Sequence, residues 1–284
     1  MRIDVTQDLD RFLASAGAWL VKSPVANNVL LTSIAAQQAG HAKGSQPAVY
    51  AWAEERGAIL GAIRWPPPLP ATMTAMPPTA AAALAAALAE RSAALPGING
   101  PSEAVSAFAS RWRELTGADA GPQRALVVSL AREVRLAEWP PGRLRLATAD
   151  EGPVLARWIA VILAAAGLSS PEEIARQQID ELLSGRRLYV WVTNEQLAAV
   201  VGHAAPAENV VLVYGGYASP EYRDAWYGTA VVAAVTAHLL EQGYACMSIT
   251  DSANPQVGAA LRAVGYEPVT DLTDVKFGAS GQAT

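Results

Sequence analysis

The sequence predicts an α+β (mixed α/β) protein made of two tandem copies of one unit, each a mixed, mostly antiparallel sheet flanked by helices. Three observations predict this fold. Apolar residues alternate in short runs typical of strands and recur at helical spacing in longer ones, and the same order of elements occurs twice. Pro140-Pro141-Gly142, which cannot lie inside a helix or a central strand, divides the 284 residues near the middle. We therefore expect domains at 1–139 and 140–277, and a small, polar, disordered tail at 278–284.

The first half is expected to contain three strands followed by two helices. The predicted strands are 48–53, 59–63 and 71–76, and the predicted helices are 79–92 and 102–116. The first of these helices is rich in alanine, the strongest helix former, and Thr79 is its expected N-cap. The second helix begins at Ser102.

The second half repeats this plan. The predicted strands are 188–192, 197–203, 210–214, 245–250 and 274–277, and the predicted helices are 227–242 and 256–264, the latter opened by a turn at 251–255. Tyr50-Ala51-Trp52 in the first half matches Tyr189-Val190-Trp191 in the second. Two copies of one unit are the economical interpretation.

The composition is that of a folded protein. Hydrophobic residues make up 51% of the chain and charged residues 17%, which is enough apolar surface for a core in each half. No stretch approaches the roughly 18 apolar residues of a membrane helix, so we expect no membrane contact. The charged first residues lead us to expect no secretory leader, and the single cysteine, Cys246, excludes a disulfide framework. These features predict a cytoplasmic protein.

Charge is distributed unevenly along the chain. The net charge of −5 divides into +1 for residues 1–141 and −6 for residues 142–284. Binding many phosphates requires a basic surface, so we expect no DNA partner. One run, 124–145, carries five arginines against two glutamates; most such runs are solvated faces. No group of His, Asp or Glu has metal-ligand spacing, so no metal site is predicted.

Three ordered motifs in the second half resemble the GNAT superfamily of N-acyltransferases, and more narrowly its members with two tandem GNAT-like halves. The motifs are ASPEYRDAWYGTA (218–230), TDSANP (250–255) and VGYEPV (264–269). The resemblance covers residues 143–277 well and residues 9–117 by architecture alone. It implies that the first half is a degenerate copy supporting an active second half.

The resemblance also implies where an acyl donor binds. A strand near residues 215–217 separates from the strand at 245–250, so that its free N–H groups bind the acyl carbonyl and the oxyanion formed from it. A loop of pattern Q/R-x-x-G-x-G/A then holds the pyrophosphate of coenzyme A at a helix N-terminus. The residues carried over are Gly215, Gly216 and Tyr217 for the carbonyl, Arg223, Trp226, Gly228 and Thr229 for the pyrophosphate, and Asn254 for the pantetheine arm.

The sequence departs from the family pattern at four places. In the loop, Trp226 takes the inner glycine position, Ala225 stands where a basic residue or glycine is usual, and Asp224 stands where a glycine is common. Leu261 stands where a tyrosine commonly protonates the departing thiolate. Trp226 either packs on the fold or has a functional role, as a plug of the pyrophosphate groove or as a stacking platform for another donor.

Four residues are candidates for proton transfer. His203 could accept the proton of an acceptor amine because imidazole titrates near neutral pH; a structural histidine is the equal alternative. Tyr214 is a candidate acid, with packing as its alternative. Glu221 and Asp251 are candidate bases, directly or through water, with surface and turn-capping roles as their alternatives.

The expected function is amide-forming acyl transfer to an amine of a small molecule. The donor is expected to be an acyl-CoA thioester, bound as a substrate, with no tightly bound cofactor. A first alternative is an aminoacyl-tRNA donor, which would need neither the phosphate loop nor a thiolate acid and could meet the basic run 124–145. A second is a catalytically silent binding module. The oligomeric state stays open.

Overall fold

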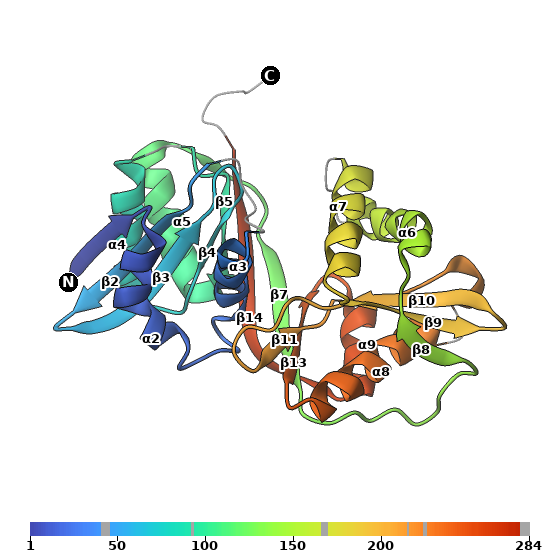
Figure 1. Cartoon of the computed structure of the whole chain (residues 1–284). Coiled ribbons are helices and arrows are strands. Elements are labelled where there is room, and N and C mark those ends of the chain that lie inside the picture. Colours follow the sequence, from blue (N-terminus) through green and yellow to red (C-terminus); the bar gives the residue numbers. More distant parts are fainter. Residues whose placement is uncertain (41–45, 92–93, 166–169, 215, 224–225, 279–284) are drawn as a thin grey trace, which may run out of the picture. The chain divides into compact units, whose positions relative to one another are not determined.

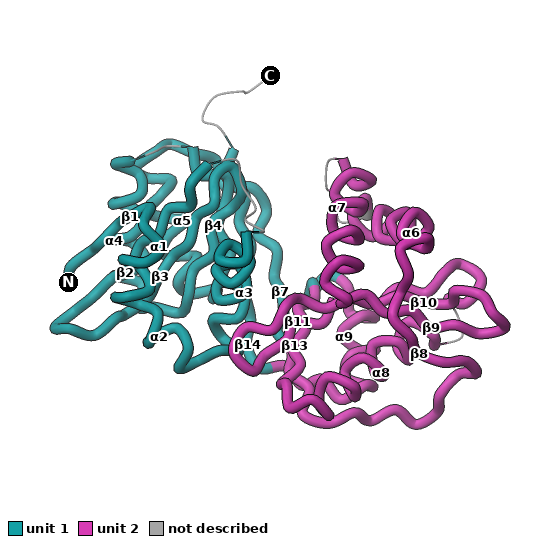
Figure 2. Tube along the Cα trace, in the orientation of Figure 1, with its two compact units in different colours: residues 1–128, 251–253, 269–284 teal, residues 129–250, 254–268 magenta. Residues whose placement is uncertain are grey.

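The computed structural model describes residues 1–40, 46–91, 94–165, 170–214, 216–223 and 226–278. The chain divides into two compact units (Figure 2). Unit 1 comprises residues 1–128, 251–253 and 269–284, and unit 2 comprises residues 129–250 and 254–268. Each unit is a sheet with helices on both faces (Figure 1).

Unit 1 contains a sheet in the order β1-β2-β3-β4-β5-β14, with β6 paired to β14. All of these pairs are antiparallel except β4 with β5. The elements wholly in unit 1 are β1 (Arg2–Thr6), α1 (Leu9–Phe12), the π-helical segment η1 (Leu13–Gly17), α2 (Ala18–Leu20), α3 (Asn28–Gln38), β2 (Val49–Glu55), β3 (Ala58–Trp65), β4 (Ala71–Met73), α4 (Pro78–Ala89), β5 (Gly97–Pro101), α5 (Ser102–Thr116) and β6 (Asp119–Ala120).

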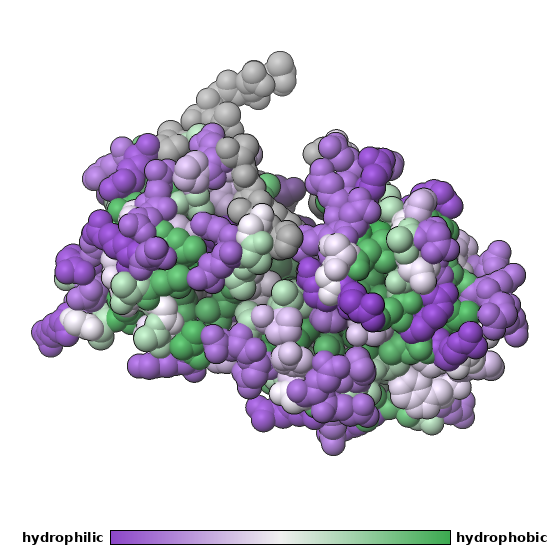
Figure 3. Space-filling model, viewed as in Figure 1, coloured by the Kyte–Doolittle hydropathy of each residue, from purple (hydrophilic) through white to green (hydrophobic). Residues whose placement is uncertain are grey.

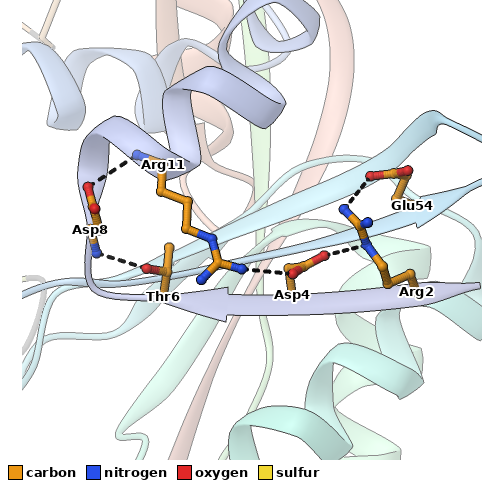
Figure 4. Close-up of polar contacts among 6 residues, drawn as sticks. All are labelled: Arg2, Asp4, Thr6, Asp8, Arg11 and Glu54. Carbon is orange, nitrogen blue, oxygen red and sulfur yellow. Dashed lines mark hydrogen bonds and ion pairs between the residues drawn. The ribbon is translucent and has the colours of Figure 1, made fainter.

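Alternation along the strands of unit 1 builds two cores. In β2, Ala51 and Ala53 pack in the core under α4 and α5, whereas Tyr50 and Trp52 pack in the core under α1 to α3. Burying a large apolar side chain contributes about 1.5–3 kcal/mol. At the edge strand β1, Arg2 contacts Asp4 and Glu54, and Arg11 contacts Asp4 (Figure 4). These ion pairs connect β1 to β2 and to α1.

Unit 2 contains a second antiparallel sheet, in the order β12-β10-β9-β8, and the parallel pair β11–β13. Helices α6 and α7 pack on one face with β9 and β10, and α8 and α9 pack on the other. The elements of unit 2 are β8 (Arg143–Leu146), η2 (Ala149–Glu151), α6 (Gly152–Ala165), α7 (Pro171–Ser184), β9 (Leu188–Thr193), β10 (Gln196–Gly202), β11 (Val210–Leu212), β12 (Tyr217–Ala218), η3 (Pro220–Tyr222), α8 (Tyr227–Glu241) and α9 (Pro255–Val264).

Three strands are divided by the unit boundary. They are β7 (Arg124–Ala131), β13 (Ala245–Asp251) and β14 (Tyr266–Gly278). The sequence-based boundary between residues 139 and 140 therefore differs from the observed division, which falls after Val128. Pro140-Pro141-Gly142 lies in the connection between β7 and β8. It interrupts the secondary structure there but does not separate the two units. Residues 269–277 also belong to unit 1, because β14 pairs with β5 from Leu272 opposite Pro101 to Lys276 opposite Gly97.

The mixed, mostly antiparallel fold in two similar units is the one that the sequence predicts. The matched triplets lie in β2 and β9, which each sit between two antiparallel partners. Helix α4 starts at Pro78 with Pro77 as N-cap, so the predicted cap at Thr79 is wrong. Proline is favoured at the first helical position because its missing N–H has no partner there. Of the predicted tail, Gly278 ends β14 and residues 279–284 lie outside the described residues.

Candidate functional site

One stretch of unit 2 changes its pairing partner between β11 and β12. Val210, Val211 and Leu212 pair in parallel with β13, and the Val213 N–H donates to the Met247 oxygen at 2.8 Å. From the next residue onward the bonds run to β10: the Tyr214 N–H donates to the Gly202 oxygen at 2.9 Å, and β12 pairs antiparallel with Ala199 and Val200. The chain therefore separates from β13 while remaining attached to β10.

Strand geometry then sets the direction of the N–H groups along β12. The Ser219 N–H donates to the Ala198 oxygen at 2.9 Å, toward β10. Successive N–H groups in a strand alternate in direction, so the Tyr217 N–H also faces β10. The N–H groups of Gly216 and Ala218 consequently face the opposite side, where β13 has separated. Gly215, the third residue predicted to bind a carbonyl, lies outside the described residues.

Close packing at Gly216 holds the first turn of α8 against this strand. A Cβ atom at Gly216 would lie 2.5 Å from the Gly228 oxygen and 2.7 Å from Val232 Cγ2, so no side chain fits there. A Cβ at Gly228 would lie 3.6 Å from the Ala218 nitrogen, which is ordinary contact. The glycine at 216 is thus required for close approach of strand and helix, whereas the glycine at 228 is not.

The N-terminus of α8 offers unpartnered backbone donors. The Ala230 N–H makes the first helical bond, to the Trp226 oxygen at 2.9 Å, and the three preceding helical N–H groups have no partner within the helix. Trp226 is the N-cap, has a left-handed φ of 62° and supplies no side-chain acceptor. Its side chain is 66% exposed. The indole is therefore not packed in the core, and its predicted roles as a plug of the pyrophosphate groove or as a stacking platform stay predictions.

An aromatic and cationic group lies on the other face of β12. Tyr217 contacts Trp158 of α6 with ring centroids 5.8 Å apart, and the Arg223 guanidinium lies 6.0 Å from the Tyr217 ring centre. Arg223 Nη2 also donates to the Tyr217 hydroxyl at 3.4 Å. The structure thus brings Gly216, Tyr217, Arg223 and the start of α8 together. The sequence pattern gives no signal for Trp158, because apolar spacing on a helix does not show which strand residue a helix side chain contacts.

The structure places His203 away from this group. Its ring is 6% exposed, stacks on Tyr189 at 5.9 Å and has Nδ1 2.8 Å from the Ala204 oxygen. Tyr189 also contacts His238 in the last turn of α8, and a 15-residue helix spans about 22 Å. His203 therefore lies toward the end of α8 opposite to Gly216. Burial is the main cause that lowers the pKa of His203, and Arg187 and His238 lower it further.

The other candidates for proton transfer lie in different surroundings. Burial raises the pKa of Tyr214, which packs with the core under α6 and α7. Asp251 belongs to unit 1, where it accepts from the Ala253 N–H at 2.9 Å and from Arg124 Nη2 at 2.9 Å, and both contacts lower its pKa. These are the contacts of a turn-capping carboxylate. Glu221 is exposed in η3.

The remaining predicted positions lie at or near helix ends. Thr229 is in the first turn of α8, and Asn254 is the exposed N-cap of α9 with no side-chain capping bond. Leu261 is 5% exposed in the core under α8 and α9, so α9 presents leucine where the family commonly has a tyrosine. Asp224 and Ala225 lie outside the described residues.

Cys246 is part of the core and not of a reactive site. It is fully buried, and burial raises the pKa of its thiol to about 12. Over the part of the chain that the structure describes, no group of three or more His, Cys, Asp and Glu side chains could hold a metal ion. Within the same residues, no helix is both long and apolar enough to cross a membrane.

The basic run 124–145 is largely neutralised by carboxylates. Arg124 pairs with Asp251, Arg135 with Glu133 and Glu267, Arg143 with Glu195, and Arg145 with Glu151. Four of its five arginines therefore already have an anionic partner. This pairing reduces the positive potential that a polyanion would meet.

A groove of about 730 Å³ lies between α6 and α7. Its lining includes small and apolar residues of α6 together with Ile179 of α7, and its charged side chains are Arg157, Glu172, Arg176 and Asp180. Figure 3 shows hydrophobic side chains exposed among hydrophilic ones where α6 lies. The groove belongs to the same helical layer as Trp158, and it offers both signs of charge beside an apolar wall.

Comparison with known proteins identifies the fold. No protein-family model and no curated protein matches the sequence. Among solved structures, a GNAT-family acetyltransferase from Colwellia psychrerythraea is 12% identical with a TM-score of 0.58, over 98% of this chain and all of that chain. A GCN5-related N-acetyltransferase from Sphaerobacter thermophilus is 13% identical with a TM-score of 0.59, over 99% and 97% of the two chains.

A third structure carries the tandem arrangement. It is a tandem GNAT protein from the clavulanic acid biosynthesis pathway, 14% identical with a TM-score of 0.54, and the match covers the whole of both chains. At such low identity these likenesses show the fold. The chain therefore has the GNAT fold in two tandem copies, which confirms the fold that the sequence motifs predict.

Proposed function

We propose that the protein is an acyltransferase that moves an activated acyl group from an acyl-CoA thioester to the amine of a small molecule. The observation that carries this proposal is the separation of β12 from β13 beside the start of α8. It directs the N–H groups of Gly216 and Ala218 toward an unpaired side of the strand, and preorganised N–H donors stabilise an oxyanion in acyl transfer.

The chemistry follows from these donors. The neutral amine nitrogen attacks the thioester carbonyl, a C–N bond forms, and the carbonyl oxygen becomes the oxyanion that accepts from the N–H groups. Collapse of this intermediate breaks the C–S bond and releases the thiolate, which takes up one proton, while the amide nitrogen loses one. Holding both reactants at this strand supplies the orientation on which the rate depends.

The residues at the start of α8 suit the pyrophosphate of the donor. Tyr227, Gly228 and Thr229 present N–H groups without helical partners, and the helix dipole favours an anion there. Arg223 is exposed and adds a positive charge close to β12. The exposed indole of Trp226 leaves these N–H groups open, and it is available to stack on a donor's adenine.

We assign the amine acceptor to the side of β12 that faces α6. Tyr217 and Trp158 form an apolar wall there, and the neighbouring groove carries Glu172 and Asp180, whose carboxylates suit an ammonium group before it is deprotonated. Leu261 cannot protonate a thiolate, so the proton reaches the leaving group from solvent or from the Tyr217 hydroxyl. Cytoplasmic placement of such an enzyme is part of the proposal, because coenzyme A thioesters are cytoplasmic donors.

Calorimetry with acetyl-CoA tests the donor. Micromolar binding of acetyl-CoA, and release of free thiol on addition of amines from a panel, are the expected results. Salt-sensitive binding of aminoacyl-tRNA without binding of acetyl-CoA would identify aminoacyl-tRNA as the donor and overturn the proposal. Absence of binding in both titrations would indicate that the protein is a catalytically silent module with this fold.

A further inference from the structure

A row of polar side chains crosses the sheet of unit 1. The strand register places Tyr50 opposite Arg64, Arg64 opposite Thr72, Thr72 opposite Asn99, and Asn99 opposite Asp274. Residues directly opposite one another project to the same face of a sheet, and Tyr50 is in the core under α1 to α3. The chain neighbours of the row form the apolar core on the other face: Ala51, Ile63, Met73, Ile98 and Val275.

Arg64 is the buried centre of this row. It is 5% exposed, the only arginine in the buried class among the described residues. Its Nη2 donates to Gln37 Oε1 at 3.0 Å, and the Tyr50 hydroxyl donates to the same oxygen at 2.6 Å. Its Nε is buried without any hydrogen-bond partner. The acceptor of both bonds is the uncharged amide oxygen of Gln37, so neither bond neutralises the charge of the Arg64 guanidinium.

Other arginines of unit 1 have anionic partners although they are far more exposed. Arg2 and Arg11, with side chains 64% and 56% exposed, contact Asp4 and Glu54 (Figure 4). Asp274 stands at the far end of the polar row, three strand spacings or roughly 14 Å from Arg64. It is too distant to act as the counter-charge of the Arg64 guanidinium. A buried charge without a counter-charge is strongly unfavourable. Within the described residues, the arginine that most needs an anion has none.

We propose that unit 1 binds a small oxyanion, the carboxylate or phosphate group of a metabolite, at Arg64. The free Nε–H and the planar guanidinium suit such a group. Thr72 and Asn99 are only partly buried, so the row opens toward β4 and β5 and offers a hydroxyl and an amide to the rest of the ligand. This proposal stands on unit 1 alone and does not depend on acyl transfer in unit 2.

Thermal unfolding of the full chain at constant ionic strength tests the proposal, with sodium phosphate and sodium acetate titrated separately against sodium chloride. We expect one of the two anions to raise the midpoint saturably, by several degrees at about 100 times its Kd. The anion that acts identifies the group. The same anion should give a saturable binding curve in calorimetry.

Two substitutions at Arg64 and one control separate binding from structure. Arg64→Met should abolish the response to the anion and leave the midpoint without anion equal or higher, because an unpaired buried charge is removed. Arg64→Lys, which keeps the charge and loses the planar fork, should weaken binding about tenfold, the loss of one charge-assisted hydrogen bond. Arg113→Met, at an exposed position of α5, should keep the full response.

Three results would overturn the proposal. One is a wild-type protein that responds to neither anion in unfolding and calorimetry. Another is Arg64→Met that retains the response. The third is Arg64→Lys with unchanged affinity, which would show that the anion binds elsewhere even if Arg64→Met fails to fold.

Discussion

Replacement of Gly216 by alanine tests the separated strand and the helix that packs on it. The added Cβ would lie 2.5 Å from the Gly228 oxygen and 2.7 Å from Val232 Cγ2, well inside contact distance. Overpacking of this kind costs about 1–3 kcal/mol. For a protein of this size the unfolding midpoint should fall by about 3–8 °C.

The loss of activity should be larger than the loss of stability. The clash is relieved only if the first turn of α8 moves away from β12, which displaces the donors of Gly216 and Ala218 from the start of the helix. Displacement of a reacting group by about 1 Å, or loss of one oxyanion donor, lowers the rate by about 10²-fold. We expect kcat of Gly216→Ala, measured as thiol released from acetyl-CoA with the best amine of a panel, to fall by about that factor.

A matched glycine substitution provides the control. At Gly17, in the π-helical segment of unit 1, a Cβ would lie 3.5 Å from Leu13 Cδ2, which is ordinary contact. Gly17→Ala should unfold at the wild-type midpoint or slightly above it, because alanine restricts the unfolded chain, and should keep its kcat. A Gly216→Ala protein that loses stability but keeps kcat within about twofold, against the 10²-fold expected from a displaced donor, would refute the role of these N–H groups.

Three further predictions concern single side chains. Arg223→Gln should raise the Kd for acetyl-CoA by about tenfold or more through loss of a charge-assisted hydrogen bond, with the unfolding midpoint unchanged because the residue is exposed; an unchanged Kd in calorimetry would contradict the phosphate site. Cys246, fully buried with a pKa of about 12, should react with a thiol reagent at about pH 8 only after unfolding in urea, and rapid reaction of the native protein would contradict its burial. The lowered pKa of His203 means that the unfolded state binds more protons below pH 6.5. The free energy of unfolding should therefore fall as pH drops through that range, and a His203→Gln protein with the same slope would contradict this assignment.

Local patterns were sufficient for several elements of both units. Helix α5 occupies the predicted 102–116, and α8 ends one residue before the predicted 242. In both helices, the signals that predict the helix are its apolar spacing and its N-terminal residues. These signals are local, because they lie within the helix itself. Helix α3 was missed because its apolar residues are not confined to one side, although Leu30 and Ile34 are buried.

Pairing between strands that are far apart in the sequence could not be predicted from local apolar patterns. Periodicity identifies 274–277 as a strand, but it does not say that this strand pairs with β5 of the other half of the sequence. The same limit applies to His203, which was chosen for its closeness in sequence to the separated strand. It follows Val200, the partner of Tyr217, by three residues, and a strand advances roughly 3.3 Å per residue. That distance along β10 carries the imidazole away from the carbonyl site.

The two units share a common plan but differ at the start of the helix that follows the separated strand, and this difference supports placing the proposed acyl site in unit 2. In unit 1 the parallel pair β4–β5 corresponds to β11–β13, and the chain leaves β5 for β3 in the same way, because the Thr74 N–H donates to the Ala62 oxygen at 3.0 Å. Helix α4 then begins with Pro77 as N-cap and Pro78 as its first residue, and proline contributes no N–H donor. The first turn of α4 in unit 1 therefore lacks one of the N–H donors that the first turn of α8 presents in unit 2. Arg64 of unit 1 is the only buried arginine among the described residues, and the anion site that we propose there would make unit 1 a diverged binding domain and not a remnant of an active one.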